Sequence, residues 1–537
     1  MSDGTETRGG GRWGGVAMNE ASQQPKQNAI GADEGAGDTR TLVTGASVGL
    51  TGAMAARALN MVSQVLMARF LGATSFGLYA IGWTMVRVLG SLGSLGLEAG
   101  VIYFGANYQR QPSKFKGAVI QSLAMPFASG AVLGAAIWFL APPLAHHVFH
   151  KPDASTVLRL FGVALPFYTV CFVAGGVTKL SQRMQYYVYS SLAQASAALL
   201  LFCILFFLGW GLASAIFATI SGFVVGALVS VCYVRRLFPV VFANDVHPRW
   251  IGSELFTYSG SVMLAGIGYN GLMFLDRFFV AAFRSSAETG IYQTASQLSI
   301  MFGILLGAFH GVFRPMVADI YARGEEKRLA ELYQVCTKWT LYACLPLFLV
   351  ILCAPGQLIE FVYGSAYVPA ATSLVVLSAS QLIMVMTAGS HTMLVMTGRQ
   401  RTFVVAALAC LLGDLLLSLI LVPDFGLSGA AVAAAISNVA LNSITVVAVR
   451  KYMGVWPVDG RLIKGCVATA VTLGVLFITR RLEIDTPAIG LLVVAFVSVA
   501  VFAGCLGAIG LDAEDWEVLW LLRNRLPLLR FWAATPS

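Results

Sequence analysis

Residues 68–80 read ARFLGATSFGLYA, and 213 positions later residues 281–293 read AAFRSSAETGIYQ. The Gly-Leu-Tyr at 77–79 aligns with the Gly-Ile-Tyr at 290–292. Two later pairs of short segments keep the same order. They are Gln-Arg at 182–183 with Gln-Arg at 400–401, and GLASA at 211–215 with GLSGA at 426–430. These ordered matches indicate that the second part of the chain duplicates the first.

Between these segments the chain alternates long apolar stretches with short polar connections. Of its 537 residues, 57% are hydrophobic and only 11% are charged, whereas a soluble protein carries about 25% charged residues. Because so few charges cannot cover a water-facing surface of this size, most of the chain faces lipid. A helix crosses a bilayer with about 20 mostly apolar residues. Fourteen such stretches are predicted: 45–68, 77–104, 117–141, 156–177, 188–209, 211–234, 254–283, 290–313, 337–362, 369–397, 402–422, 427–449, 464–481 and 487–510.

The duplication divides these predicted spans into groups. Six spans separate each segment from its duplicate, so both copies enter the membrane in the same direction, as parallel repeats do. The predicted fold is all-α, with one six-helix lobe at 41–240, a second at 241–455 and two additional helices at 456–511. Residues 1–40 are predicted to be a disordered cytoplasmic tail, and 512–537 a cytoplasmic amphipathic tail. Parallel repeats place a substrate path between their lobes, although duplication without transport is an alternative.

The distribution of positive charge predicts the orientation. If the N-terminus is cytoplasmic, the inside segments hold 26 Lys and Arg and the outside segments hold 6. That bias predicts a multi-pass protein of the cell inner membrane with both termini cytoplasmic. The basic residues are scattered between apolar runs, which argues against a nucleic-acid partner. No outside connection is long enough for a catalytic domain, so we expect no enzyme activity and no catalytic residues.

Cofactor and metal signals are lacking in the sequence. The nine cysteines form no C-x-x-C pair and no metal-ligand spacing with histidine. No G-x-x-x-x-G-K-[ST] loop for a nucleotide phosphate is present. We therefore expect no bound metal or cofactor, and any driving force has to come from an H⁺ or Na⁺ gradient or from removal of the product.

Several segments of the chain resemble a known family. They are ARFLG at 68–72, FGLY at 76–79, LDRFF at 275–279, ETGIY at 288–292, FVYGSAY at 361–367, TGR at 397–399 and LVPDFGLSGAA at 421–431. Together, and in this order over about 40–455, they look like the polysaccharide-transporter (oligosaccharide flippase) branch of the multidrug/oligosaccharidyl-lipid/polysaccharide exporter superfamily. The helix before the Pro-x-x-Gly turn often carries an amide near Asp414 in that family, so the acid here is a departure.

The resemblance implies a fold and a function. It implies two six-helix lobes in a V shape around a central cavity. It also implies that undecaprenyl-diphosphate-linked oligosaccharide units move from the inner to the outer leaflet, by alternating access, for a surface polysaccharide such as O-antigen, exopolysaccharide or capsule. A polysaccharide polymerase and a chain-length regulator are the partner proteins it implies.

Charged residues inside the predicted spans are the candidate site. An arginine in mid-helix costs about 2.5–3.5 kcal/mol on insertion scales and needs a reason, and its planar fork binds phosphate in a bidentate manner. Arg57 and Arg87 are therefore the leading candidates to bind the diphosphate, and Arg277 is a weaker one. Asn60 and Gln64 share one helix face with Arg57, and structural ion pairing is the alternative role for these arginines. Asn270 is a further polar residue predicted to line the cavity.

Three carboxylates are candidates for ion coupling: Asp276, Glu98 and Asp414. For Glu98, near a helix end, a simple structural role is an equal alternative. For Asp414, and for the intramembrane His391, an interhelical hydrogen bond is the alternative.

Two other functions remain open from the sequence. A cation-coupled multidrug exporter of the same superfamily predicts an acid-dominated cavity instead of an arginine-lined one. A membrane-embedded glycan polymerase or ligase predicts a large outside loop, and none is seen in the predicted topology.

Overall fold

The computed structural model describes residues 32–108, 110–181, 183–387, 389–479 and 487–510. The chain divides into two compact units, Met1–Thr44 and Gly45–Ser537. In the first unit the described residues are helical, because helix α1 begins at Ala32. The predicted cytoplasmic tail at 1–40 stays a prediction: its residues 32–40 are helical, while 1–31 and the predicted amphipathic tail at 512–537 lie outside the described residues. The fold and the cavities below belong to the second unit.

The described residues contain helices and turns and no strand. The α-helices are α1 (Ala32–Gly93), α2 (Leu97–Tyr108), α3 (Pro112–Pro143), α4 (Ala154–Lys179), α5 (Met184–Phe207), α6 (Leu212–Leu237), α7 (Gly252–Phe283), α8 (Ser286–Ser299), α9 (Met301–Ala322), α10 (Glu326–Cys353), α11 (Pro355–Tyr363), α12 (Ala371–Met386), α13 (Ser390–Met396), α14 (Gln400–Met453), α15 (Leu462–Thr479) and α16 (Pro487–Ile509). Short turns of other helical types lie at η1 (Leu144–Val148), η2 (Pro239–Val241) and η3 (Ser365–Ala370). The all-α prediction is confirmed.

Helices overlap each of the fourteen predicted spans within the described residues. Two pairs of spans are joined into single long helices, and four spans, 77–104, 290–313, 337–362 and 369–397, are each divided between two helices. Ten helices among the described residues are long and apolar enough to cross a membrane, and two of them are 57 and 54 residues long. At 1.5 Å per residue each would extend about 80 Å, more than twice the hydrocarbon thickness of about 30 Å. Each bends at a glycine with positive φ, Gly72 at 73° and Gly426 at 58°, a conformation that glycine adopts without strain. The exact count of fourteen crossings stays a prediction.

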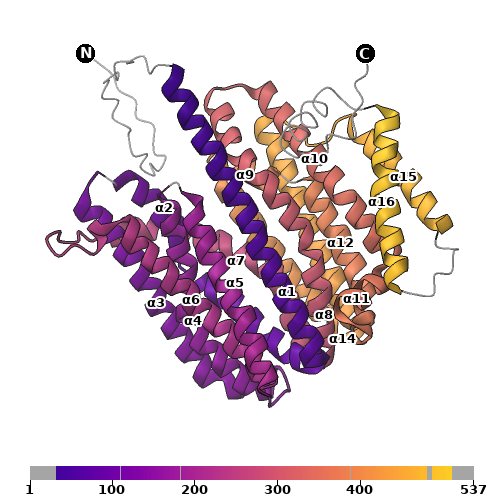
Figure 1. Ribbon diagram of the computed structural model, residues 1–537, viewed down its shortest axis with the longest axis horizontal. Coiled ribbons are helices and arrows are strands. Elements are labelled where there is room, and N and C mark those ends of the chain that lie inside the picture. Colours follow the sequence, from indigo (N-terminus) through magenta and orange to yellow (C-terminus); the bar gives the residue numbers. More distant parts are fainter. Residues whose placement is uncertain (1–31, 109, 182, 388, 480–486, 511–537) are drawn as a thin grey trace, which may run out of the picture. The chain divides into compact units, whose positions relative to one another are not determined.

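Helices of the same predicted lobe pack against one another. In the first lobe α3, α4 and α6 lie side by side, and α5 packs on α6 (Figure 1). In the second lobe α7 and α12 pack on α14, and α10 packs on α12. The last two helices, α15 and α16, pack on each other and on α10 (Figure 1). Helix α7 also packs on α2, so it contacts both lobes.

The two repeated segments contact each other directly. A Cβ atom at Gly77 would collide with the carbonyl oxygen of Ser286, and one at Gly290 would collide with that of Ala73. Because Ser286 is the duplicate of Ala73 at the 213-residue offset, the contact is the same in both directions, as at a twofold axis. We call residues 73–77 and 286–290 the glycine clasp. Backbones approach this closely only because neither glycine carries a side chain.

Side-chain hydrogen bonds between the lobes surround the glycine clasp. The Tyr367 hydroxyl donates to the Ala68 carbonyl at 2.6 Å. Arg69 Nε donates to a carbonyl of the second lobe at 2.8 Å. The acceptor of this bond is the Val362 carbonyl. Arg69 Nη2 also donates to the Phe361 carbonyl, and Lys151 Nζ donates to the Ala281 carbonyl. The lobes are therefore closed against each other at this end.

Candidate functional site

Two cavities adjoin along helix α7. The larger, of about 510 Å³, is lined by α7, α9, α12, α13 and α14 together with one residue of α1. The smaller, of about 230 Å³, is lined by α1, α2, α4 and α7 and by residues between α1 and α2. Val262 and Gly266 of α7 border both cavities, so this helix forms the wall between them. The larger cavity belongs mainly to the second lobe and the smaller mainly to the first.

The larger cavity extends away from the glycine clasp. Helix α14 begins at Gln400, turns at Gly426 and returns to Met453. That turn is tied to the clasp end by Arg284, whose Nη2 donates to the Pro423 carbonyl at 3.1 Å. Gln400 and other lining residues near the two ends of α14 therefore lie at the opposite side of the membrane domain from the clasp. The cavity reaches the end at which the lobes are not closed by the clasp.

Arg57 brings positive charge from the first lobe into the larger cavity. It lines this cavity from α1, and its guanidinium lies over Gly307 of α9, where an added Cβ would be 3.0 Å from Nη1. No ion pair joins Arg57 to a carboxylate in the described part of the chain. A guanidinium that lacks an internal counterion attracts an anion from outside the protein.

Arg87 and Arg277 meet at one aromatic ring. The Arg87 guanidinium carbon lies 5.0 Å from the centroid of Phe274, and that of Arg277 lies 4.7 Å from it. Both are within cation–π range. Arg87 lines the smaller cavity, whereas Arg277 is 4% exposed and lines neither cavity. The two candidates are thus brought together, but Arg87 faces open space and Arg277 is enclosed within the protein.

Asp276 and Asp414 form a buried acidic pair in the second lobe. Asp276 accepts the Tyr292 hydroxyl at 2.7 Å and the backbone N–H of Arg277 at 2.8 Å. Asp414 is 0% exposed, and neither of its oxygens makes a well-formed hydrogen bond within the described residues, although the Ser437 hydroxyl interacts with it. A buried carboxylate is costly to ionise without a counter-charge, so the burial of Asp414 favours a proton or a bound cation on this group.

The other carboxylate candidate is paired. Glu98 Oε1 accepts Lys179 Nζ at 2.7 Å, and the two side chains are 24% and 25% exposed. The pair joins α2 to the end of α4 inside the first lobe. Glu98 also borders the smaller cavity. An acid already neutralised by a lysine favours the structural role over ion coupling.

The amide candidates divide among separate cavities. Asn60 and Gln64 do not line the larger cavity with Arg57; they border a small space of about 20 Å³ inside the first lobe. There Gln64 donates to the Tyr79 hydroxyl at 3.1 Å. Asn270 borders the smaller cavity and donates to the Gly266 carbonyl at 2.9 Å. The helix face predicted for Arg57, Asn60 and Gln64 is therefore shared between two cavities.

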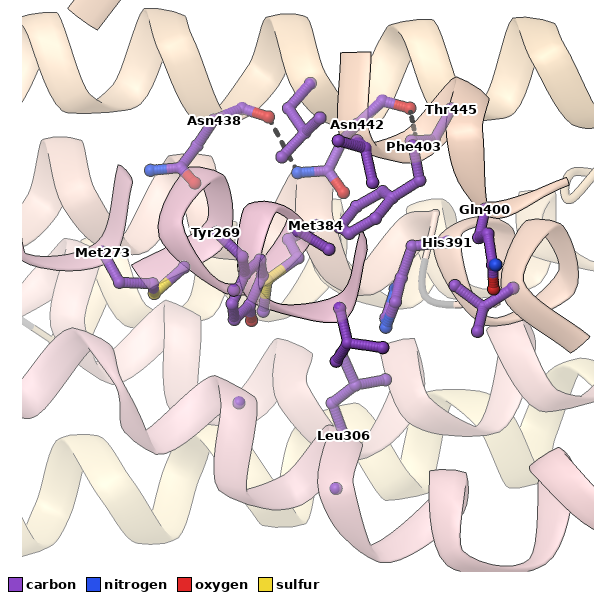
Figure 2. Close-up of a pocket in the computed structure, with 18 of the residues that line it drawn as sticks. Tyr269, Met273, Leu306, Met384, His391, Gln400, Phe403, Asn438, Asn442 and Thr445 are labelled. Atoms are coloured by element: carbon purple, nitrogen blue, oxygen red, sulfur yellow. Dashed lines mark hydrogen bonds between the residues drawn. The ribbon is translucent and has the colours of Figure 1, made fainter. Parts of the chain in front are cut away.

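The polar wall of the larger cavity was not predicted as a site. Asn438, Asn442 and Thr445 line it from α14, with His391 and Gln400 close by (Figure 2). The available signal was the spacing of two asparagines by four residues within the apolar stretch 427–449, which places them on one helix face. Polar residues inside a membrane span mark functional paths more often than chance.

Comparison with known proteins identifies the family. Residues 66–372 match the model of the family described as "Polysaccharide biosynthesis protein". The chain is similar to a probable low-salt glycan biosynthesis flippase of Haloferax volcanii, with 24% identity over 36% of this chain and 40% of the relative. It is also similar to the stage V sporulation protein B of Bacillus subtilis, with 23% identity over 48% of this chain and 52% of that one. The chain thus spans about half the length of these curated relatives.

Solved structures show the same fold. The inward closed conformation of the lipid II flippase MurJ matches with a TM-score of 0.64 at 13% identity, covering 86% of this chain and 98% of that one. An inward-facing multidrug resistance transporter of the MATE family, of the MOP superfamily, matches with a TM-score of 0.63 at 16% identity, covering 76% and 98%. The flippases and transporters among these matches are not enzymes. The predicted polysaccharide-transporter family is confirmed by the family match, and the solved structures confirm the fold.

Proposed function

Because the chain belongs to the polysaccharide biosynthesis protein family, we propose that it is a flippase for lipid-linked oligosaccharides. Its substrate class is an undecaprenyl-diphosphate-linked repeat unit, moved from the inner to the outer leaflet for a surface polysaccharide. The observation that carries this proposal is Arg57, a guanidinium with no counterion among the described residues, in a cavity that both lobes line. A polysaccharide polymerase and a chain-length regulator are the expected partners.

The charge of the substrate explains the arginines. A lipid diphosphate is an anion that hydrocarbon excludes, so its path requires fixed positive charge. Arg57 in the larger cavity and Arg87 in the smaller supply that charge on either side of the α7 wall. Arg277, behind Phe274, adds to the positive potential around Arg87. Arginine stays protonated at all physiological pH values and accommodates phosphate oxygens in pairs.

Orientation follows from the positive-inside bias. With both termini cytoplasmic, the glycine clasp lies at the outer face and the larger cavity extends toward the cytoplasm. The substrate is assembled on the cytoplasmic leaflet, so this conformation is the one that accepts it. Opening of the clasp and closure of the opposite end then complete an alternating-access cycle.

The buried acidic pair supplies a means of ion coupling. We expect one of the two carboxylates, Asp276 or Asp414, to take up H⁺ or Na⁺, because two buried carboxylates that interact repel each other when both are ionised. Asp276 lies on α7 itself, next to Arg277, and Asp414 lies on α14, which packs on α7. Loading and release of the ion therefore change the charge next to the helix that contacts both lobes.

A multidrug exporter is the second candidate, and the MATE-like fold favours it. A cation-binding cavity requires exposed carboxylates. The described residues that line the larger cavity include Arg57 and no carboxylate. The charge of this cavity thus supports an anionic substrate.

Deletion of the gene tests the proposal. The deletion strain is expected to accumulate undecaprenyl-diphosphate-linked oligosaccharide on the cytoplasmic leaflet, identified by mass spectrometry of extracted lipids. Arg57→Ala with Arg87→Ala should fail to relieve that accumulation, whereas Arg235→Ala, an exposed arginine at the end of α6, should relieve it. Normal polymer and no accumulated lipid in the deletion strain would contradict the proposal.

A further inference from the structure

The wall of the larger cavity that α14 forms is polar but uncharged. Asn438, Asn442 and Thr445 are spaced by four and three residues, so they occupy one face of the helix. All three line the cavity, and Figure 2 shows them in a row along α14. We call these three residues the amide wall. In a membrane domain such a row of polar side chains needs hydrogen-bond partners, because lipid chains offer none.

Each amide of this wall keeps hydrogen-bonding capacity for a ligand. Asn438 Nδ2 donates to the Ala434 carbonyl at 2.9 Å, and within the described residues its Oδ1 accepts no hydrogen bond. Asn442 Nδ2 donates to the Asn438 carbonyl at 2.8 Å, and its Oδ1 accepts the Thr387 hydroxyl at 3.1 Å. An amide has two N–H donors and two acceptor lone pairs. One N–H of each asparagine, and the Oδ1 of Asn438, therefore remain for a molecule in the cavity.

Other residues that line the cavity add groups of the same kind. His391 of α13 and Gln400 at the start of α14 lie next to each other along the cavity, and Tyr269 projects from α7 (Figure 2). The His391 ring packs 5.8 Å from that of Phe403. Each of these polar groups either donates or accepts hydrogen bonds, and the rings offer flat apolar faces.

The duplicate positions in the first lobe show that the fold does not require these amides. At the 215-residue offset, Asn438 corresponds to Phe223 and Asn442 to Ala227. Phe223 is 2% exposed and stacks on Trp83 at 6.0 Å between centroids, so ring packing fills the equivalent face of the first lobe. The same helix position thus holds a packed ring beside a space of only about 20 Å³ in one lobe and a polar side chain in a cavity of about 510 Å³ in the other. A difference of this kind between duplicates points to a ligand.

We infer that the amide wall, with His391 and Gln400, is the subsite that binds the glycan of the lipid-linked substrate. Sugar hydroxyl and acetamido groups both donate and accept hydrogen bonds, as neutral amides do, and sugar rings expose apolar faces to aromatic residues. A volume of about 510 Å³ lies within the usual range of roughly 300–1,000 Å³ for small-molecule sites. Arg57 at the α9 side of the same cavity then holds the diphosphate.

This assignment rests on the proposed function and adds that different residues bind the two parts of the substrate. The arginines bind the part that every lipid diphosphate shares. The amide wall of the second lobe binds the part that differs between glycans. Loss of the amides should therefore change which lipid is bound, and loss of Arg57 should weaken binding of all of them.

Native mass spectrometry of the purified full-length protein tests the assignment with two probes. One is undecaprenyl diphosphate without sugar, and the other is the undecaprenyl-diphosphate-linked oligosaccharide extracted from the deletion strain. In the wild type the glycosylated lipid should bind more tightly. Asn438→Ala and Asn442→Ala should each weaken its binding about fivefold, the value of one neutral hydrogen bond, and leave the bare diphosphate unchanged. Asn107→Ala, an exposed asparagine at the end of α2, serves as the matched control.

The outcomes distinguish failure of the glycan subsite from failure of the flippase function. Retained binding of the bare lipid shows that an amide variant is folded. Equal weakening of both lipids, or no weakening of either, in the double Asn438→Ala, Asn442→Ala variant would overturn the glycan subsite and leave the flippase proposal standing. A wild type that binds neither lipid but binds the cation tetraphenylphosphonium would overturn both.

Discussion

Arg57 and Asn60 are one helical turn apart, yet they border different cavities. Their spacing predicts a shared helix face, and each of the two side chains does border a cavity. Which cavity each side chain enters depends on the neighbouring helices, here α9 beside Arg57 and the first-lobe helices beside Asn60. Spacing within one helix holds no information on those neighbours. That arginines inside the predicted spans need a function was predictable from their insertion cost alone. Their division between cavities was not.

We expect the substitution Asp414→Asn to uncouple transport from the ion gradient. The amide does not bind H⁺ and neutralises the repulsion with Asp276 permanently. Transport by Asp414→Asn in reconstituted vesicles should then be the same with and without an imposed H⁺ or Na⁺ gradient, whereas the wild type is stimulated. Glu98→Gln, which alters a lysine-paired acid, is the matched control. Undiminished stimulation of the Asp414 variant would exclude this residue from coupling.

The burial of Lys151 predicts that the population of the closed glycine clasp depends on pH. Burial lowers the pKa of Lys151 from 10.5 to about 8, and the Glu288 carboxylate opposes that shift. If an open clasp returns Lys151 to water, its ordinary pKa is restored. The closed state is then favoured increasingly as pH rises from about 8 to 10.5 and is penalised by a constant amount below pH 8.

The measurement for this prediction is the distance between spin labels at Thr74 and Phe283 in a cysteine-free background, followed from pH 7 to 9.5. The closed population should grow with pH in the wild type. Lys151→Met should remove that change, and a variant that keeps the full pH dependence would exclude Lys151 as its source.

At the scale of elements, the repeat that reveals the duplication is also the contact between its copies. The Gly-x-Tyr pattern at 77–79 and 290–292 marks both. Each tyrosine bonds within its own lobe, Tyr79 to Gln64 and Tyr292 to Asp276, while each glycine meets the other lobe. Sequence indicates close packing at such glycines, but not that the partner is the duplicate segment. The turns at Gly72 and Gly426 fall between predicted spans, as expected for residues with positive φ.

A methyl group at Gly77 should open the clasp. Its collision with the Ser286 carbonyl occurs only when the lobes are closed at this end, so Gly77→Ala penalises that state by about 1–3 kcal/mol. This corresponds to a shift of about 5–150-fold toward the open clasp. Spin labels at Thr74 and Phe283 should report the longer distance. Gly260→Ala, with no heavy atom near the added methyl, should keep the wild-type distribution, and an unchanged Gly77→Ala distribution would contradict the contact.

At the scale of the whole molecule, hydropathy and the duplication predict an all-α membrane protein, and the resemblance of ordered segments such as LVPDFGLSGAA at 421–431 predicts the family. The hydropathy pattern also predicts the last two helices, α15 and α16, which pack on α10. What could not be predicted is the asymmetry between the lobes. Phe223 and Asn438 occupy equivalent helix positions, and only their three-dimensional surroundings show one face filled and the other hollow. Cavities are formed by several elements together, so no single stretch of sequence defines them.

The most direct test of the flippase account is transport by the purified protein alone. Vesicles are prepared with fluorescently labelled lipid-linked oligosaccharide from the deletion strain, and the impermeant reductant dithionite is added outside. We expect protein-free vesicles to lose only the fluorescence of the outer leaflet. Vesicles with the wild type should lose all of it, and those with Arg57→Ala and Arg87→Ala should behave as if protein-free. Quenching limited to the outer leaflet with the folded wild type, under every ion gradient imposed, would contradict the account.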